Sequence, residues 1–463
     1  MLDQSVICAI STPPGSGGIA VIRLSGKEAI EIAGKVFSSP SKKPLSGFPA
    51  NTVHFGEIID GEQTVDEVLV ALFRTPHSYT GENTVEVTCH GSVYIQQCIL
   101  QLLIGKGARL ALPGEFTQRA FLNGKMDLSQ AEAVADLIAS TSDGMHKLAL
   151  NQMRGGFSNE LAKLRSQLLD FTSLIELELD FTEEDVEFAD RNHLKTLAID
   201  IERIIHKLAN SFSVGNAIKN GIPVAIIGET NAGKSTLLNL LAGEERAIVS
   251  DIHGTTRDMI EDAINVSGIT FRFIDTAGIR ETSDVIESIG IERTFRKLEQ
   301  ASIVLWVIDL TSPANDIKLL ARQIVPRSEG KHLVLVFNKS DLLTPEELNK
   351  KQDLLSNLPV ARIYISAKQR LNTESLQHEL LRAASLPDIN QNDIIVTNVR
   401  HYEALMNALH AIRRVIENLT SGISGDFLSQ DIRECIHYLG EITGQINNDE
   451  ILGNIFANFC IGK

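Results

Sequence analysis

Basic residues are scarce relative to acidic ones in this chain of 463 residues. Lys and Arg number 43 against 59 Asp and Glu, which gives a formal net charge of −16 at pH 7. Because phosphates are bound mainly by clustered cations, this balance argues against a broad face for binding nucleic acid. A nucleic acid, if one is bound, must meet local basic patches or a partner protein.

Cysteines and long apolar runs are also scarce. The five cysteines form no Cys-x-x-Cys pair and are odd in number, which suits a reducing cytosol and gives no zinc signature. No run of 18 or more apolar residues exists, and the amino terminus lacks a basic-then-apolar signal. Cys460 stands fourth from the end, but Gly462 and Lys463 do not fit a prenylation motif. We therefore expect a cytoplasmic protein without a membrane anchor.

The most informative segment that is present begins at Gly228 and reads Gly-Glu-Thr-Asn-Ala-Gly-Lys-Ser. It follows the apolar run 222–227 and leads into the helical pattern 236–241. A strand that ends in GxxxxGKS and opens into a helix is a phosphate-binding loop, whose backbone N–H groups and helix N-terminus surround a triphosphate. Lys234 would reach the β- and γ-phosphates, and the Ser235 hydroxyl would bind Mg²⁺. The expected nucleotide contacts here are Asn231, Ala232, Gly233, Lys234, Ser235 and Thr236.

Two later segments favour guanine. Residues 338–341, Asn-Lys-Ser-Asp, follow a buried-strand run and fit the NKxD element of GTPases. The Asp341 carboxylate can accept two hydrogen bonds from guanine N1–H and the exocyclic amine, which adenine cannot supply. Lys339 would lie along the base plane, and Asn338 would tie this loop to the phosphate loop. Ser366-Ala367-Lys368, after another strand-like run, would offer a backbone N–H to guanine O6.

Two switch segments lie between the phosphate loop and the guanine-binding loops. Asp275-Thr276-Ala277-Gly278 ends a strand-like run, which puts Asp275 near Mg²⁺ through a water and Gly278 near the γ-phosphate. Thr256 supplies the second hydroxyl ligand of Mg²⁺, and GTP would order both loops. Ile279 stands where Ras-like enzymes carry a water-positioning Gln. The expected contacts of the first switch are Ser250, Asp251, Ile252, His253, Gly254, Thr255 and Thr256.

The length of the chain and the changes in its hydrophobic pattern predict three domains of a multidomain α+β and α/β fold. Residues 1–118 mix short β-branched runs with helical stretches, as in an α+β domain. Residues 119–215 and 385–463 are helical in pattern, and neither segment closes a core alone, so we expect one helical domain built from both. Residues 216–384 form an inserted Ras-like P-loop GTPase domain, whose movements would pass through both linkers.

Four stretches carry a family resemblance: residues 12–26, 112–117, 127–133 and the final Cys460-Ile461-Gly462-Lys463. With them the whole chain resembles the bacterial and organellar MnmE (TrmE) family of tRNA modification GTPases. The resemblance implies a homodimer joined through the amino-terminal domain. It also implies an FAD-dependent partner, MnmG (GidA), in a heterotetramer or larger complex. Together they would add a (carboxymethyl)aminomethyl-type group at C5 of the wobble uridine of certain tRNAs.

The resemblance also implies what replaces the missing Gln. A potassium ion would be bound by Asn231, by the backbone carbonyls of Ser250 and Ile252 and near Thr255, and it would neutralise developing charge as an arginine finger does. Glu287 matches the water-orienting glutamate of the family. Taken without the family, the sequence favours reading Glu287 as a solvated acid in a loop. Arg280 is a further switch-region candidate of lower standing.

A folate site is implied by the resemblance alone. The family's pocket for 5-formyl- or methylene-tetrahydrofolate maps to Arg23, Glu82, Lys125 and Lys463, which taken singly read as surface charges. Glu82 could bond the amino-pyrimidine edge of a pterin. Cys460 is either a nucleophile or a small residue that lines the pocket.

Two other classes of function stay open. In one, the chain is only a regulatory switch and scaffold with a vestigial folate pocket. In the other, it is a ribosome-assembly GTPase, which would need a basic RNA-binding appendage that the sequence does not offer.

Overall fold

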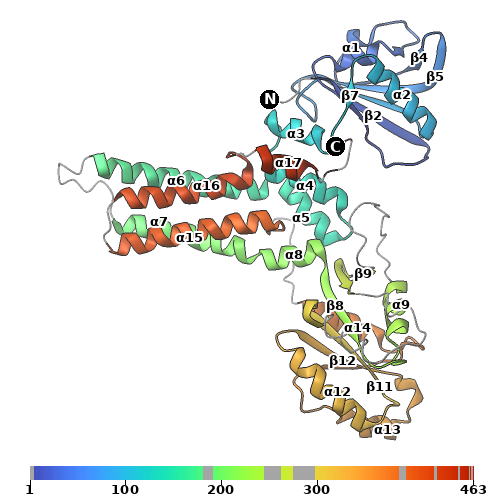
Figure 1. Ribbon diagram of the computed structural model, residues 1–463, viewed down its shortest axis with the longest axis vertical. Coiled ribbons are helices and arrows are strands. Elements are labelled where there is room, and N and C mark those ends of the chain that lie inside the picture. The colour runs from blue at the N-terminus through green and yellow to red at the C-terminus, as the bar shows by residue number, and fades with distance from the viewer. Residues whose placement is uncertain are drawn as a thin grey trace. The chain divides into compact units, whose positions relative to one another are not determined.

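The computed structural model describes residues 5–180, 191–244, 262–274, 298–384, 393–421, 425–446, 449–457, 459 and 462. The chain forms two compact units, each assembled from segments far apart in the sequence (Figure 1). The first comprises residues 1–135, 152–196 and 410–463, and the second comprises residues 136–151 and 197–409.

A seven-stranded sheet forms the amino-terminal part of the first unit. Its strands, in the order β3-β4-β5-β6-β2-β1-β7, are antiparallel except for the parallel pair β1 and β7. Alternate residues such as Val85 and Val87 join one core with the helices α1 and α2. On the other face, Phe116 of α3 packs with Ile7 and Ala9. The elements are β1 Ile7–Ile10, β2 Ile19–Ser25, α1 Ala29–Gly34, β3 Phe37–Ser38, η1 Leu45–Gly47, β4 Thr52–Asp60, β5 Gln63–Phe73, β6 Thr84–His90, α2 Val93–Gly105, β7 Arg109–Leu110 and α3 Glu115–Leu122.

Long helices complete the first unit, and α6 packs along α16 (Figure 1). The apolar stripe of α6 is buried as its spacing of threes and fours predicts, with Leu161, Leu164, Leu168, Phe171 and Ile175 at most 2% exposed. Leu128 of α4 and Phe456 of α17 belong to a smaller core. The helices wholly in this unit are α6 Gly156–Asp180, α16 Gly425–Thr443 and α17 Asp449–Ala457, whereas α4 Leu128–Ala139, α5 Asp143–Met153, α7 Arg191–Asn210 and α15 Val399–Ser421 each have residues in both units.

A six-stranded sheet organises the second unit, in the order β13-β12-β11-β8-β10-β9. All neighbours are parallel except the edge strand β9. Leu237 of α9 and Leu376 of α14 pack on one face of this sheet, and Ile317 of α12 packs on the other. The elements are β8 Ile222–Ile227, α9 Lys234–Glu244, β9 Asp262–Val266, β10 Ile269–Phe273, β11 Ile303–Asp309, α12 Ala314–Arg327, β12 His332–Asn338, η3 Ser340–Leu342, α13 Pro345–Gln352, β13 Ala361–Tyr364 and α14 Thr373–Ala384.

Helix α8, Phe212–Asn220, leads directly into β8. The single residue between them is Gly221, with φ 76° and ψ 156°. A side chain is disfavoured at this φ, and a Cβ here would lie 3.2 Å from the carbonyl oxygen of Thr270. The expected domain limit at residue 216 falls inside α8.

The predicted fold class is confirmed: an α+β amino-terminal domain, helices from two segments, and an α/β domain with the strand order of Ras-like P-loop proteins. Among the described residues, no helix is both long and apolar enough to cross a bilayer.

Candidate functional site

The phosphate-loop sequence connects the carboxyl end of β8 to α9, which begins at Lys234. Asn231 and Gly233 both take positive φ, 64° and 96°. A Cβ at Gly233 would lie 2.2 Å from the Asn338 side-chain nitrogen, so only glycine fits there. The strand, loop and helix therefore have the form that the sequence predicts.

The Lys234 ammonium lies against its own loop. Its Nζ donates to the carbonyl oxygens of Gly228 at 2.9 Å and Glu229 at 2.6 Å. These bonds hold a positive charge beside backbone N–H groups at a helix N-terminus, where an anion is favoured.

The side chain of Asn338 joins three loops at one edge of the sheet. Its Nδ2 donates to the Ala232 carbonyl at 2.8 Å, and its Oδ1 accepts from the Ala367 N–H at 3.0 Å. Asn338 is 3% exposed, so both bonds are shielded from water. The loops after β8, β12 and β13 thus converge, because parallel strands present their carboxyl ends at one edge.

Lys339 and Asp309 form an ion pair beside this junction. Lys339 Nζ lies 2.5 Å from Asp309 Oδ2, with side-chain exposures of 29% and 12%. Partial burial opposes ionisation of Asp309, but hydrogen bonds from Lys339 and Thr311 outweigh it and the pKa is lowered. Asp309 is therefore ionised at neutral pH, and sequence reasoning missed it because nothing local links it to the NKxD element.

The remaining guanine candidates surround the same edge. Asp341 lies exposed in the turn η3, whose first residue Ser340 donates its N–H to the Ile365 carbonyl at 3.1 Å. Ser366 and Ala367 are buried, and Lys368 is exposed. The structure thus brings together Asn338, Lys339, Asp341, Ser366, Ala367 and Lys368 with the phosphate loop.

Several predicted site residues lie outside the described residues. These are the first-switch residues Ser250, Asp251, Ile252, His253, Gly254, Thr255 and Thr256, the second-switch residues Asp275, Thr276, Ala277, Gly278, Arg280 and Glu287, and the terminal residues Cys460 and Lys463.

A second polar site gathers the folate candidates of the amino-terminal part. The Glu82 carboxylate accepts from Ser25 at 2.7 Å and from the Arg119 guanidinium at 3.1 Å. Arg23 Nε donates to Glu86 at 2.8 Å, and Nη1 lies 3.5 Å from the Gly462 carbonyl oxygen. Arg23 and Ser25 share one face of β2, so Arg23 and Glu82 border the same site.

Lys125 lies at the rim of this polar site. Its Nζ donates to the Pro76 carbonyl at 3.0 Å, and a Cβ on Gly81 would meet its side-chain carbons at 3.4 Å. Lys125 is therefore placed beside the turn that carries Glu82.

Sequence reasoning missed the two buried residues that support this site. Arg119 donates to Glu115 at 3.0 Å and to the Ser5 carbonyl at 2.9 Å, and both ionic side chains are 2% exposed. Burial opposes ionisation of Glu115, but bonds from Arg109, the Leu112 N–H and Arg119 lower its pKa overall. Their spacing of four on one short helix was the available signal.

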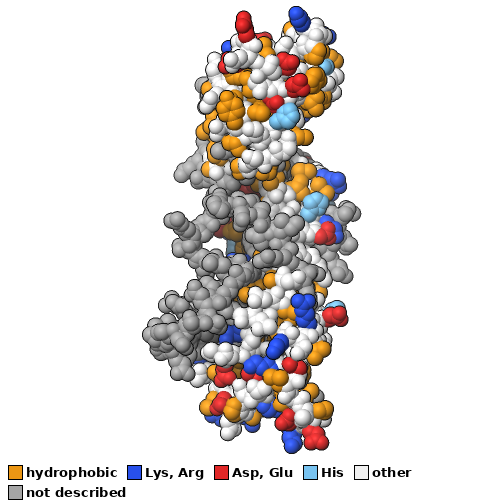
Figure 2. Space-filling model, turned by 90° about the vertical axis from the view of Figure 1, so that its right-hand side faces the viewer, with side chains coloured by type: hydrophobic (Ala, Val, Ile, Leu, Met, Phe, Trp, Pro, Cys, Tyr) orange, Lys and Arg blue, Asp and Glu red, His pale blue; other side chains and the backbone are white. Residues whose placement is uncertain are grey.

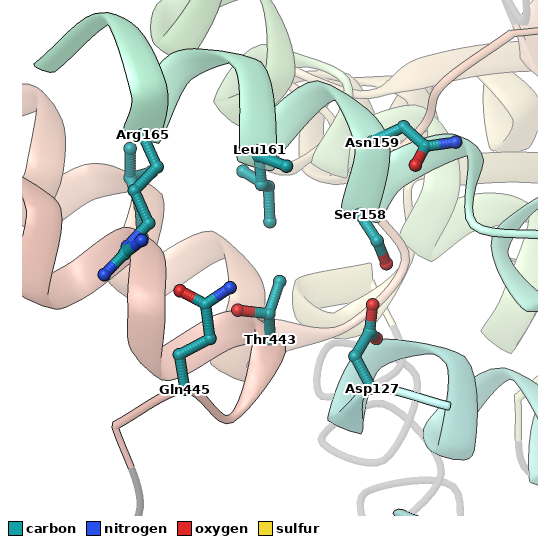
Figure 3. Close-up of a pocket in the computed structure, with 9 residues that line it drawn as sticks. Asp127, Ser158, Asn159, Leu161, Arg165, Thr443 and Gln445 are labelled. Carbon is teal, nitrogen blue, oxygen red and sulfur yellow. The ribbon is translucent and has the colours of Figure 1, made fainter. Parts of the chain in front are cut away.

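A cavity of about 200 Å³ lies among the helices of the first unit (Figure 3). In Figure 3, Asp127 and Ser158 border one side, with Arg165 and Gln445 at the opposite end. The buried Arg165 Nε has no hydrogen-bond partner among the described residues. No residue of the nucleotide loops or of the polar site around Glu82 lines this cavity.

The family model described as "MnmE helical domain" matches residues 128–460, and "GTP-binding protein TrmE N-terminus" matches residues 6–125. The chain belongs to the MnmE (TrmE) family. The resemblance drawn from the motifs is therefore confirmed.

Curated MnmE relatives match the chain from end to end. The chain is 64% identical to the tRNA modification GTPase MnmE of Bacteroides fragilis over 466 residues, covering 100% of both chains. It is 63% identical to the protein of the same name from Bacteroides thetaiotaomicron, again over 100% of both. Among solved structures, Era in complex with MgGDPNP and 16S ribosomal RNA nucleotides is 27% identical, with a TM-score of 0.27 over 41% of this chain and 65% of that one.

Proposed function

We propose that this MnmE-family chain is a cytoplasmic, potassium-dependent GTPase that acts in tRNA modification. With an FAD-dependent partner of the MnmG kind it would add a (carboxymethyl)aminomethyl-type group at C5 of the wobble uridine. The proposal that the chain is a GTPase rests on the side chain of Asn338, which is hydrogen-bonded both to the phosphate loop and to the loop of Ala367 in one buried network. GTP hydrolysis would drive the conformational switch.

The phosphate end of the site fits a Mg²⁺-nucleotide. Lys234 opens α9 with its ammonium at the loop, and Ser235 follows at the helix N-terminus, where its hydroxyl can join Thr256 as a ligand of Mg²⁺. The metal would neutralise phosphate charge when bound. Asp275 and Gly278 complete this half of the proposal.

The base end fits guanine. Asp341 is exposed at the edge where Lys339 and the Ala367 loop meet, so its carboxylate is free to accept from the N1–H and amine of the base. The buried Asn338 fixes the distance between base loop and phosphate loop. Ser366, Ala367 and Lys368 would close the site over guanine O6.

Asn231 supports the potassium proposal. It lies exposed in the phosphate loop and has a left-handed backbone, with φ 64°. An amide oxygen is a suitable ligand for a hard monovalent cation. Ser250, Ile252 and Thr255 would complete the shell, and Glu287 would orient water.

The polar site around Glu82 supports a tetrahydrofolate ligand. The Glu82 carboxylate is held by Ser25 and Arg119, and its remaining lone pairs can accept from an amino-pyrimidine edge. Arg23, 5.6 Å from the Tyr79 ring centre and 5.7 Å from that of Phe116, offers a cation beside two aromatic faces. Lys125 and Lys463 would meet ligand oxygens, and Cys460 would line the pocket.

An exposed apolar patch supports the homodimer. Val53, Phe55 and Leu69 are 62%, 51% and 46% exposed. Phe55 pairs with Leu69 across β4 and β5, so these two form continuous apolar surface. A patch of this kind on a half-covered sheet favours association with another apolar surface.

The charge distribution bears on how tRNA would bind. On the face shown in Figure 2, basic and acidic side chains are interspersed on the described surface. Phosphates would then meet local contacts and the partner protein rather than a broad basic face.

We also propose that the domains comprise residues 1–118, 119–215, 216–384 and 385–463.

The test is GTP turnover of the purified chain in potassium and in sodium salts, with and without Asn231→Ala. We expect strong slowing in sodium with nearly unchanged GDP binding, and no salt preference in the variant. Equal rates in both salts would overturn potassium dependence. Stoichiometric tetrahydrofolate binding without the partner separates the modification enzyme from a pure switch with a vestigial pocket.

A further inference from the structure

The end of β11 lies beside the guanine-binding loop. Asp309 is the last residue of β11 and stands next to Asn338 of β12 in the parallel register. The Leu310 N–H also donates to the Asn338 carbonyl at 3.1 Å. The segment after β11 is therefore attached to the backbone that presents Lys339.

Each oxygen of the Asp309 carboxylate has a partner. Oδ1 accepts from the Thr311 N–H at 2.8 Å and from the Thr311 hydroxyl at 2.7 Å. Oδ2 accepts from Lys339 Nζ at 2.5 Å. The Thr311 bonds fix the carboxylate, so Lys339 is drawn to an acceptor that is already in place.

The conformation of Lys339 carries two free-energy costs. Its backbone is left-handed, φ 64°, a conformation disfavoured for a residue with a Cβ. Its long side chain also loses rotamer freedom when it is held in one direction. Because Asp309 already holds the Lys339 side chain, this rotamer entropy is lost before a nucleotide binds and does not weaken binding.

The segment after Asp309 is itself held from two sides. Lys351 of α13 donates to the carbonyls of Leu310 and Ser312, the latter at 3.0 Å. The Ser312 hydroxyl donates to the Glu229 carboxylate in the phosphate loop at 3.3 Å. This segment thus touches both the base loop and the phosphate loop.

We propose that Asp309 is a positioning residue for nucleotide binding, which holds the Lys339 side chain alongside the guanine base, and that Lys351 keeps the Asp309 segment in place. This proposal rests on the GTPase function proposed above. Asp309 touches no nucleotide atom in this role and acts through Lys339.

The test is a double-mutant cycle on the full-length chain with GDP as the probe. Asp309→Asn keeps the shape and removes the charge, and we expect it to weaken GDP binding by about tenfold. In a Lys339→Met background the same change should alter binding by less than about twofold, because the group it positions is gone. Asp316→Asn, an exposed acid on α12, is the matched control and should bind like the parent.

Kinetics separate positioning from general damage. With Asp309→Asn we expect the KM for GTP to rise about as much as the Kd for GDP, while kcat at saturation stays within about twofold. A drop in kcat with unchanged KM, or equal weakening in both backgrounds, would overturn the proposal. If Asp309→Asn does not fold, Lys351→Met serves instead: we expect about threefold weaker binding, and unchanged binding overturns the role.

GDP binding by the parent chain separates a failure of the positioning role from a failure of the GTPase function. If it fails to bind GDP, the GTPase proposal fails and the positioning role with it. If it binds GDP and Asp309→Asn binds equally well, the positioning role alone is wrong.

Discussion

The Asn338 side chain donates a hydrogen bond of 2.8 Å to the carbonyl oxygen of Ala232, which lies 106 residues earlier in the chain. The same side chain accepts from Ala367, so one amide holds the phosphate loop and both base loops at a common edge. Gly233 leaves the room that this contact requires.

Asn338→Ala should therefore loosen both ends of the site. It leaves a buried N–H and a buried carbonyl without partners, at about 1–3 kcal/mol each. We expect GDP affinity to fall more than about tenfold, with a lower melting temperature, in a binding titration and a thermal melt. The exposed Asn349→Ala is the control, and equal losses in both variants would contradict the network role.

Asp341→Asn should change which base is preferred. The mutant amide presents a donor where the carboxylate had an acceptor, so guanine loses its partner and xanthine gains one. We expect GTP binding to weaken and xanthosine triphosphate binding to strengthen in parallel titrations. Unchanged GTP affinity would mean that Asp341 does not face the base.

Glu287→Ala tests the water-orienting role against that of a solvated acid. If Glu287 acts mainly in the transition state, kcat should fall by roughly 10²-fold or more with little change in nucleotide binding. Single-turnover hydrolysis and a GDP titration measure the two quantities. Normal hydrolysis would refute the role, and slow hydrolysis with normal wobble-uridine modification in cells would break the proposed coupling.

Glu115→Gln should destabilise the amino-terminal part in a pH-dependent way. The pKa of Glu115 is lowered in the folded chain, so its ionised form contributes stability above the ordinary value near 4.5, and this is lost as pH falls through the folded value. Removing one partner of the buried pair with Arg119 costs about 3–5 kcal/mol at pH 7. Denaturant unfolding at pH 7 and below pH 4 should show the difference shrinking in acid.

The exposed Glu62→Gln is the control for this measurement. The free energy of unfolding of this variant should equal that of the parent at both pH values. A penalty for Glu115→Gln that is the same at both pH values would point to lost packing instead of lost charge.

Local signals predicted the strands that lead into the candidate nucleotide loops. Ile222–Ile227 forms β8 as predicted, and His332–Asn338 forms β12, because continuous apolar runs bounded by glycine or polar turns are typical of buried parallel strands. The pattern of residues 27–37 alone predicts a helix, but the helix that forms, Ala29–Gly34, is shorter because Phe37 pairs with Ile58 in the sheet. Tertiary pairing overrode the local pattern there.

Contacts between distant segments could not be predicted from the sequence. Arg119 meets Glu82 and Ser5 only after the sheet and α3 have assembled. Asp309 meets Lys339 only because β11 and β12 lie side by side. A single sequence shows none of these distances, so such supporting residues emerge only from the folded chain.

Gly221 gives α8 and β8 a joint of a single residue. Its two torsion angles set the angle between α8 and the following strand β8, which ends at the phosphate loop. A residue with a side chain would be pressed toward Thr270 and out of the left-handed region. Substitution there would change the direction of α8 relative to β8 without altering any residue of the phosphate loop, so the joint affects the orientation of the helix and leaves the composition of the site unchanged.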